Sequence, residues 1–333
     1  MKIIQSDQEW DKLQSSLDAS FLQSSAWAKF QSVLPAQSFR LNGEGWTCLL
    51  IKKRSRFWTY LFAPYGPTLG KEANLVDALR SITAFAKENK IDWLRLEPTK
   101  GISTNSDLSQ QLKKAGATPA VRSVNPSLTR IVDISAPEEA LLSSISSSTR
   151  TFIRKNDREP VLTYKTSYDP DDMKHFVEML GEVSARNNVN FRPDSATYYT
   201  KQAQALMPSK NLRLEIALKD NKPVACAVMH DLNKTTTYAY AASYPEARKY
   251  SASALLLWQA IKNAKKLGIE NLDLFGIAPR EADKSHPWYG FTAFKEKFGG
   301  EVISHGGTWD VPLTYRYRIY RTLLMATRLI APK

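Results

Sequence analysis

The sequence of 333 residues contains only two cysteines and four histidines. Cys48 and Cys226 lie far apart in apolar segments of strand type, and the histidines do not have the spacing of metal ligands. This pattern argues against a disulfide-stapled fold and against a zinc centre. We therefore expect both cysteines to be small core residues.

The sequence also lacks long apolar runs and low-complexity tracts. No segment reaches the roughly 18 uninterrupted apolar residues that a membrane span requires. The N-terminal stretch MKIIQSDQEWDKL lacks the apolar core of a secretory signal. The sequence therefore predicts a cytoplasmic protein.

Positive charge is in excess, with a formal net charge of +13. Such a surface suits a polyanionic partner, which could be nucleic acid, an anionic membrane or a phosphorylated substrate. Within the serine-rich segment 135–159, Arg150, Arg154 and Arg158 fall on one face of a predicted helix. This face could contact phosphate or RNA, or it could simply be exposed to solvent.

The most informative pattern is an internal repeat. Residues about 45–100 align without a gap with residues about 223–278, so that Tyr60 pairs with Tyr238 and Cys48 with Cys226. A period this long exceeds the roughly 20 to 50 residues of a solenoid unit, so the repeated unit should be a whole domain. Two similar domains side by side would form a cleft.

Each copy is predicted to contain two strands, a loop with proline, an amphipathic helix and a buried strand. In the second copy these elements are expected at about 223–231, 235–243, 244–250, 251–267 and 269–275. The prediction is an α/β protein with mixed sheets. We place the first domain at residues 1–135 and the second at 136–310.

Several motifs in a fixed order resemble those of the FemABX peptidoglycan aminoacyltransferases over nearly the whole chain. They are FLQSSAWAKFQ, YLFAPYGPTLG, YAYAASYPEAR, ALLLWQAIKNAKKLG, LDLFGI and GFTAFKEKFGGE. The resemblance implies two tandem N-acetyltransferase (GNAT)-like domains that use no metal and no cofactor. Such an enzyme moves an amino acid from aminoacyl-tRNA to an amine of a peptidoglycan precursor peptide.

The resemblance is strongest to the compact, FemX-like branch, because the long helical-hairpin insertion of some family members is missing. That branch acts on the soluble UDP-MurNAc-pentapeptide, although a lipid-linked precursor remains possible as the acceptor.

Catalytic candidates come from two places in the chain. The resemblance puts the lysine of a Phe-Lys pair at Lys295, which would hold the tRNA end or stabilise the oxyanion, with Phe294 packing against a terminal base or sugar. Glu97 stands where the family has an aspartate, at the end of a strand and before Pro98. It is a candidate base, and a structural salt bridge is the alternative.

Substrate-binding candidates also follow from the resemblance. Lys29 and Arg192 match the family's contacts to the precursor's pyrophosphate, one from each domain. Tyr240 and either Tyr198 or Tyr199 match its tyrosines that bind the precursor. Each could instead be a solvated charge or a strand tyrosine with an internal partner.

The C-terminal segment TYRYRIYRTLLMATRLIAPK interleaves basic and aromatic residues. It could contact RNA, or it could lie as an amphipathic helix on an anionic membrane. The resemblance implies that residues 311–333 pack back on the first domain.

Two other classes of function stay open. The first is an N-acyltransferase with an acyl-CoA donor, whose pyrophosphate would bind at the loop RKYSASA, where Ser251 occupies the usual glycine position. The second is a non-catalytic module that binds tRNA or a membrane surface.

Overall fold

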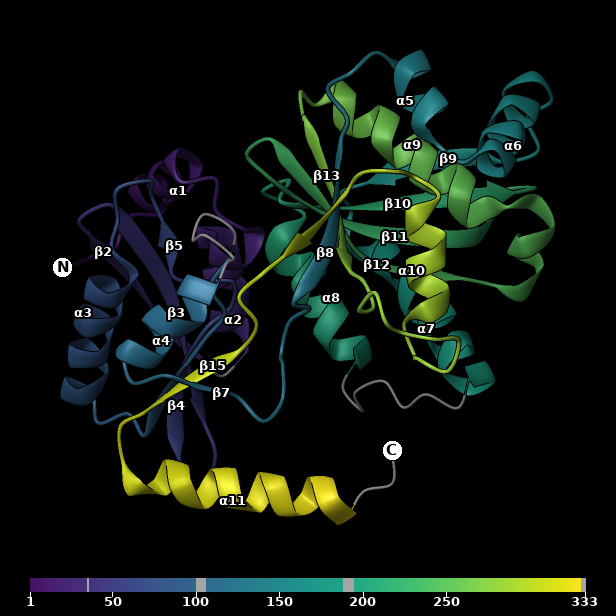
Figure 1. Ribbon diagram of the computed structural model, residues 1–333. Helices are drawn as coiled ribbons and strands as arrows, with labels where there is room; N and C mark the ends of the chain where they lie inside the picture. The colour runs from purple at the N-terminus through teal and green to yellow at the C-terminus, as the bar shows by residue number, and fades with distance from the viewer. Residues whose placement is uncertain (35, 100–105, 188–194, 331–333) are drawn as a thin grey trace. The chain divides into compact units, whose positions relative to one another are not determined.

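The computed structural model describes residues 1–34, 36–99, 106–187 and 195–330. The chain forms two compact units, one made of Met1–Ser127 with Ile303–Lys333 and the other of Leu128–Val302. Each unit contains one mixed β-sheet with helices packed on it (Figure 1). The predicted α/β class with mixed sheets is therefore confirmed.

The first unit is built on an eight-stranded sheet with the order β1-β2-β3-β4-β6-β15-β7, in which β5 pairs with β3. Strands β4 and β6 are parallel, and the other pairs of this sheet are antiparallel. The elements are β1 (Lys2–Ile3), α1 (Asp7–Ser16), η1 (Phe21–Gln23), α2 (Ser25–Val33), β2 (Gln37–Gly43), β3 (Trp46–Arg54), β4 (Thr59–Ala63), β5 (Thr68–Leu69), α3 (Leu75–Glu88), β6 (Trp93–Leu96), α4 (Ser106–Lys114), β7 (Thr118–Pro119), β15 (Trp309–Pro312) and α11 (Tyr315–Ile330).

The second unit is built on a seven-stranded sheet with the order β14-β8-β13-β12-β11-β10-β9. Helix α9 lies above this sheet in Figure 1, and α7 and α8 lie below it. The elements are β8 (Leu128–Asp133), α5 (Glu138–Ser144), α6 (Ser147–Arg158), β9 (Thr163–Ser167), η2 (Pro170–Asp172), α7 (Met173–Asn187), α8 (Ser195–Leu206), β10 (Leu212–Lys219), β11 (Lys222–Leu232), β12 (Thr235–Ser243), η3 (Pro245–Tyr250), α9 (Ala252–Lys266), β13 (Asn271–Gly276), α10 (Tyr289–Glu296) and β14 (Glu301–Ser304).

The internal repeat of the sequence corresponds to a repeat of structure. Strands β3, β4 and β6 with helix α3 in the first unit match β11, β12 and β13 with helix α9 in the second. In both copies the last two strands are parallel, β4 with β6 and β12 with β13. Cys48 and Cys226 occupy equivalent strands and are buried and free, as the sequence predicts.

Local sequence explains the repeated helix. In α3, the side chain of Asn74 accepts hydrogen bonds from the backbone N–H groups of Val76 and Asp77 and so caps the N-terminus. Leu75, Leu79 and Ile82 are buried on one face, as a helical period of 3.6 residues requires. The helix thereby covers one face of the first sheet with apolar side chains.

Strands from outside the repeat complete both sheets. In the first, β15 from the end of the chain pairs antiparallel with β6. In the second, β8 pairs antiparallel with β13. The sequence division at residue 135 places β8 in the first domain, whereas β8 belongs to the second sheet in the structure. After Val302 the chain returns to the first unit, where it forms β15 and α11.

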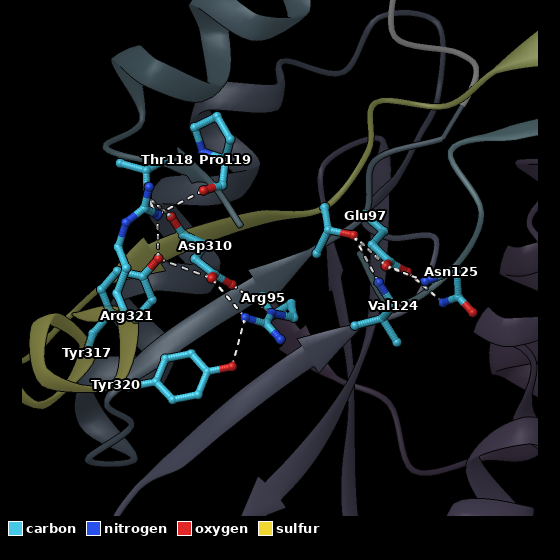
Figure 2. Close-up of polar contacts among 11 residues, drawn as sticks. Arg95, Glu97, Thr118, Pro119, Val124, Asn125, Asp310, Tyr317, Tyr320 and Arg321 are labelled. Carbon is cyan, nitrogen blue, oxygen red and sulfur yellow. Dashed lines mark hydrogen bonds and ion pairs between the residues drawn. The ribbon is translucent and has the colours of Figure 1, made fainter. Parts of the chain in front are cut away.

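A buried ion pair joins β15 to the rest of the first sheet. The guanidinium of Arg95 on β6 donates to both carboxylate oxygens of Asp310, at 2.8 and 2.9 Å (Figure 2). Burial alone would lower the pKa of Arg95, but the hydrogen bonds and the charge of Asp310 outweigh it and raise the pKa. Tyr317 donates a hydrogen bond to Asp310, and the phenol of Tyr320 lies 3.4 Å from Arg95, so this pair also anchors α11.

We predict that Asp310→Asn destabilises the first unit by about 3 to 5 kcal/mol, because it leaves the guanidinium of Arg95 buried without its counter-charge. Helix α11 should then become sensitive to limited proteolysis. Urea unfolding and proteolysis followed by mass spectrometry measure both effects.

The matched control is Asp77→Asn, which removes the exposed ion pair with Arg80 in the same unit. It should change stability by no more than about 1 kcal/mol. Equal losses of stability in the two variants would show that the buried pair stabilises the unit no more than the exposed one.

Candidate functional site

The parallel strands of the second unit diverge at one point. Strands β12 and β13 pair from Thr235 with Asn271 to Thr237 with Asp273, and both continue beyond that pairing. At the same place, β13 changes register against β8 between Asp273 and Gly276. Such irregularities re-aim side chains and expose backbone groups.

The backbone at this irregularity is strained. Phe275 has a φ of 58°, a left-handed conformation that is rare for a bulky residue. Its N–H donates a 2.7 Å hydrogen bond to Oδ1 of Asp273, and the hydroxyl of Thr129 on β8 donates to the same oxygen. Burial raises the pKa of Asp273, and these two hydrogen bonds oppose that effect only in part.

Lys295 lies at this strained segment. Its ammonium, carried by α10, donates a 2.6 Å hydrogen bond to the carbonyl oxygen of Gly276. Burial lowers the pKa of Lys295 from an ordinary value of 10.5 to about 8, although the nearby charge of Asp273 acts to raise it. A poorly solvated ammonium of this kind gains most when an anion approaches it.

Phe294 precedes this lysine and packs against the core of the second unit. Its ring lies 5.6 Å from Phe298 and 6.5 Å from Tyr238 between centroids. It is partly buried, so its core contacts fix the end of α10 that carries Lys295. The stacking of Phe294 on a terminal base or sugar stays a prediction.

A small pocket of about 140 Å³ lies between α10 and the segment that follows β13. Thr292, Ala293 and Glu296 of α10 line one side of it. The hydroxyl of Thr292 accepts a 2.8 Å hydrogen bond from the N–H of Ala278, which ties the two walls together. The pocket is therefore formed by the same two segments that hold Lys295 and Gly276.

The tyrosine candidates meet on the other face of the sheet. Tyr199 lies between Phe176 and Tyr240, with 5.0 Å between ring centroids on each side, and Tyr198 is 5.4 Å from it. The register of β12 against β11 shifts at Ala239. Because of this bulge, Tyr238 packs toward the core that includes α9, whereas Tyr240 contacts α8.

Glu97 is buried in the first unit and fully engaged there (Figure 2). One carboxylate oxygen accepts hydrogen bonds of 2.9 Å from the N–H of Asn125 and from the hydroxyl of Thr308. The other accepts a 2.6 Å hydrogen bond from the side-chain amide of Asn125. This arrangement fits a residue that fixes two loops, and a role as base stays a prediction.

The remaining candidates are placed as follows. Lys29 on α2 is exposed, while neighbouring Trp27 packs edge-on against Phe21 and Phe30. Arg192 lies outside the described residues. On α6, Arg150 donates to the carbonyl oxygen of Ser143.

Sequence reasoning missed Asp273, Thr129 and Phe275. The signal for the first was present, since LDLFGI places a carboxylate inside an otherwise apolar strand. Thr129 lies more than 140 residues earlier and meets Asp273 only through the pairing of β8 with β13. Nothing in the local sequence marks Phe275 as left-handed.

In the part of the chain that the structure describes, no three His, Cys, Asp or Glu side chains form a group that could hold a metal ion. The described helices also include none with the length and hydropathy to span a bilayer.

Comparison with known proteins gives a clear family match. The model of the FemAB family matches residues 6–218 and 201–324. A search of curated protein sequences found no match.

Among solved structures, the crystal structure of FemX superposes with a TM-score of 0.82 at 18% identity, covering 97% of this chain and 100% of that one. L-PGS from Bacillus licheniformis has a TM-score of 0.59 at 11% identity, with 98% of each chain covered. A tandem GNAT protein from the clavulanic acid biosynthesis pathway has a TM-score of 0.55 at 12% identity, with 93% of this chain and 97% of that one covered. These likenesses confirm the expected fold of two tandem GNAT-like domains.

We predict that Lys295 makes stability depend on pH between about 8 and 10.5. In that window the unfolded chain binds a proton at this lysine that the folded chain does not, so stability rises with pH. Lys295→Met should remove this contribution, which is at most about 1.4 kcal/mol for each pH unit. Urea unfolding of both proteins from pH 7 to 10 measures the difference.

The exposed Lys297 near the end of the same helix supplies the control. The Lys297→Met protein should show the same pH dependence of the free energy of unfolding as the unsubstituted protein. If the free energy of unfolding of the Lys295→Met protein depended on pH as it does in the unsubstituted protein, the ammonium of Lys295 would not be desolvated.

Proposed function

Because this chain belongs to the FemAB family, we propose that it transfers an amino acid from aminoacyl-tRNA to an amine of the stem peptide of a peptidoglycan precursor. The acceptor is UDP-MurNAc-pentapeptide or its lipid-linked counterpart. Charged tRNA and these precursors are available in the cytoplasm, where the proposal places the reaction.

The chemistry is aminolysis of an ester. The amine nitrogen of the precursor attacks the carbonyl carbon of the aminoacyl ester and forms a tetrahedral oxyanion. The bond to the ribose oxygen of the tRNA then breaks, the new amide remains, and the proton lost by the amine goes to the departing oxygen. The protein must align the two substrates, accept or relay that proton and stabilise the oxyanion.

The observation that carries the proposal is the poorly solvated ammonium of Lys295, at the point where β12 and β13 diverge, in a chain that matches the family model over most of its length. This ammonium is suited to the terminal phosphate of tRNA or to the developing oxyanion. An anion would raise its pKa, so binding should favour the charged lysine. Until then the hydrogen bond to the carbonyl oxygen of Gly276 holds it in place, and the charge of Asp273 favours its protonated form.

The precursor-binding roles rest on the motifs of the sequence. We propose that Lys29 and Arg192 bind the pyrophosphate of the precursor, and that Tyr240 and Tyr198 or Tyr199 donate hydrogen bonds to its sugar or peptide. The exposed ammonium of Lys29 supports this for one of the two cations. Contact between Tyr240 and Tyr199 supports a shared role for the tyrosines.

A coenzyme A thioester is the alternative donor. Ser251, at the start of α9 and at the position of the acetyltransferase glycine, adopts a left-handed φ of 52°, a conformation that glycine adopts most readily. However, the N–H of Ser251 donates to the carbonyl oxygen of Arg248 at 3.1 Å, and that of Ala247 donates to Tyr244 at 3.1 Å. These two donors are engaged within the chain. The match to the FemAB family is what favours tRNA as the source of the acyl group.

We predict that label from a mixture of tRNAs charged with labelled amino acids reaches UDP-MurNAc-pentapeptide or the lipid-linked precursor. Prior RNase treatment should abolish the transfer. Lys295→Ala should slow it by about 10²- to 10³-fold, as loss of one oxyanion-stabilising group does.

Lys297→Ala, from the same end of α10, serves as the control and should transfer label at the normal rate. If label reaches neither acceptor but acetyl-CoA is consumed with an amine acceptor, the donor proposed here is wrong. Unchanged transfer by the Lys295→Ala protein would contradict only the role of Lys295, and the proposed reaction would stand.

We also predict that Lys29→Glu weakens binding of UDP-MurNAc-pentapeptide by at least about tenfold, because a phosphate contact becomes a repulsion. Arg192→Glu should do the same. Calorimetric titration with the precursor measures both. Lys12→Glu, an exposed charge reversal on α1, should leave the affinity unchanged, and equal affinities of all the variants would contradict the pyrophosphate contacts.

A further inference from the structure

Helix α11 has two faces of different character. Its inner face is fixed to the first sheet, where the ring of Tyr320 stacks on Trp93 at 4.5 Å and Arg321 donates to the carbonyl oxygen of Pro119 at 2.8 Å. Tyr315, Ile319 and Leu323 follow one another at four-residue spacing on the opposite face. Their exposed fractions are 70%, 51% and 53%, so the helix presents an apolar stripe to solvent.

The turn between β3 and β4 extends this apolar surface. Phe57 in that turn is 64% exposed. Its carbonyl oxygen accepts a 3.4 Å hydrogen bond from Arg316 at the start of α11, and the ring of neighbouring Trp58 lies 5.2 Å from that of Tyr320. In Figure 1, α11 lies across the ends of the strands of this unit, near β4. Residues far apart in the sequence thus contribute to one apolar surface.

The exposed charged side chains that the turn and α11 contribute at this surface are positive. Arg54 and Arg56 flank the turn, and Arg316 and Arg318 flank the stripe on α11; all four side chains are exposed. None of the ion pairs found in the described part of the chain involves them. The sequence contains no acidic residue after Asp310.

We propose that this face of the first unit docks on an anionic lipid bilayer. An apolar stripe bordered by arginines is the pattern of helices that lie in the plane of a membrane interface. The arginines would bind anionic headgroups while Phe57, Ile319 and Leu323 enter the boundary of the acyl chains. The proposal is independent of the transfer reaction.

The observations favour a membrane over RNA as the occupant. RNA would use the arginines and could stack bases on Phe57 or Tyr315, but the aliphatic side chains of Ile319 and Leu323 have no role in base stacking. Aliphatic side chains at the centre of a basic surface gain free energy when they leave water for lipid.

The test is sedimentation of the full chain with vesicles. Phosphatidylcholine vesicles are compared with vesicles made of equal parts phosphatidylcholine and phosphatidylglycerol. We expect binding to the anionic vesicles, weakened by salt. The double substitution Ile319→Ser with Leu323→Ser should lower the partition constant by at least about tenfold. Arg316→Gln with Arg318→Gln should lower it by roughly thirtyfold, at about 1 kcal/mol for each arginine.

Leu267→Ser is the matched control, because Leu267 is 54% exposed and belongs to the second unit. It should bind vesicles like the unsubstituted chain. Thermal unfolding of each variant checks its fold. If the double variant does not fold, the single substitution Ile319→Asn is tested in its place.

Three results would overturn the proposal. The first is absence of binding to anionic vesicles, and the second is equal vesicle binding by the Ile319→Ser, Leu323→Ser variant. The third is a dimer in solution that this variant dissociates, which would assign the apolar stripe to a second copy of the chain. If the first result is accompanied by binding of tRNA that the arginine substitutions weaken, the face belongs to RNA.

Discussion

The buried ion pair of Arg95 with Asp310 is the interaction on which the first unit depends. It joins a strand from the repeat to a strand from the end of the chain, more than 200 residues later. Its two hydrogen bonds satisfy a guanidinium that would otherwise be costly to bury. Because Tyr317 and Tyr320 bond to the same pair, the position of α11 follows from it. The exposed face of that helix is therefore held at a fixed orientation on its own unit.

The second unit contains features that lower its stability, in contrast to the buried ion pair that stabilises the first unit. There, β12 and β13 separate, Phe275 takes a left-handed conformation, and the ammonium of Lys295 is poorly solvated beside Asp273. Strained backbone and desolvated charge are unfavourable for folding, and such features gather at functional sites. The apolar core around α9 and the packing of Phe294 and Phe298 stabilise this unit enough to tolerate them.

Sequence reasoning reached the fold because the repeat carries local signals. Apolar strand segments, a loop with proline and the period of an amphipathic helix define the repeated elements. The observed bounds of β11, β12, α9 and β13 agree with the predicted ones to within two residues. The strands outside the repeat could not be assigned to a sheet in this way. Strand β8 pairs with a strand more than 130 residues later. The hydrogen bonds of Glu97 likewise come from loops distant in sequence, so its local position left both a base and a structural salt bridge as alternatives.

Comparison of the two copies also shows where the units differ in chemistry. Arg95 in the first copy aligns with Asp273 in the second. In the pairing of β6 with β15, Arg95 lies directly opposite Asp310, and the carboxylate neutralises the charge of the guanidinium. In the pairing of β13 with β8, Asp273 lies opposite Ile131 and the register then shifts. The hydroxyl of Thr129 and the N–H of Phe275 donate hydrogen bonds to its carboxylate. One aligned position therefore serves as an anchor for α11 in the first unit, and in the second it leaves a carboxylate beside Lys295.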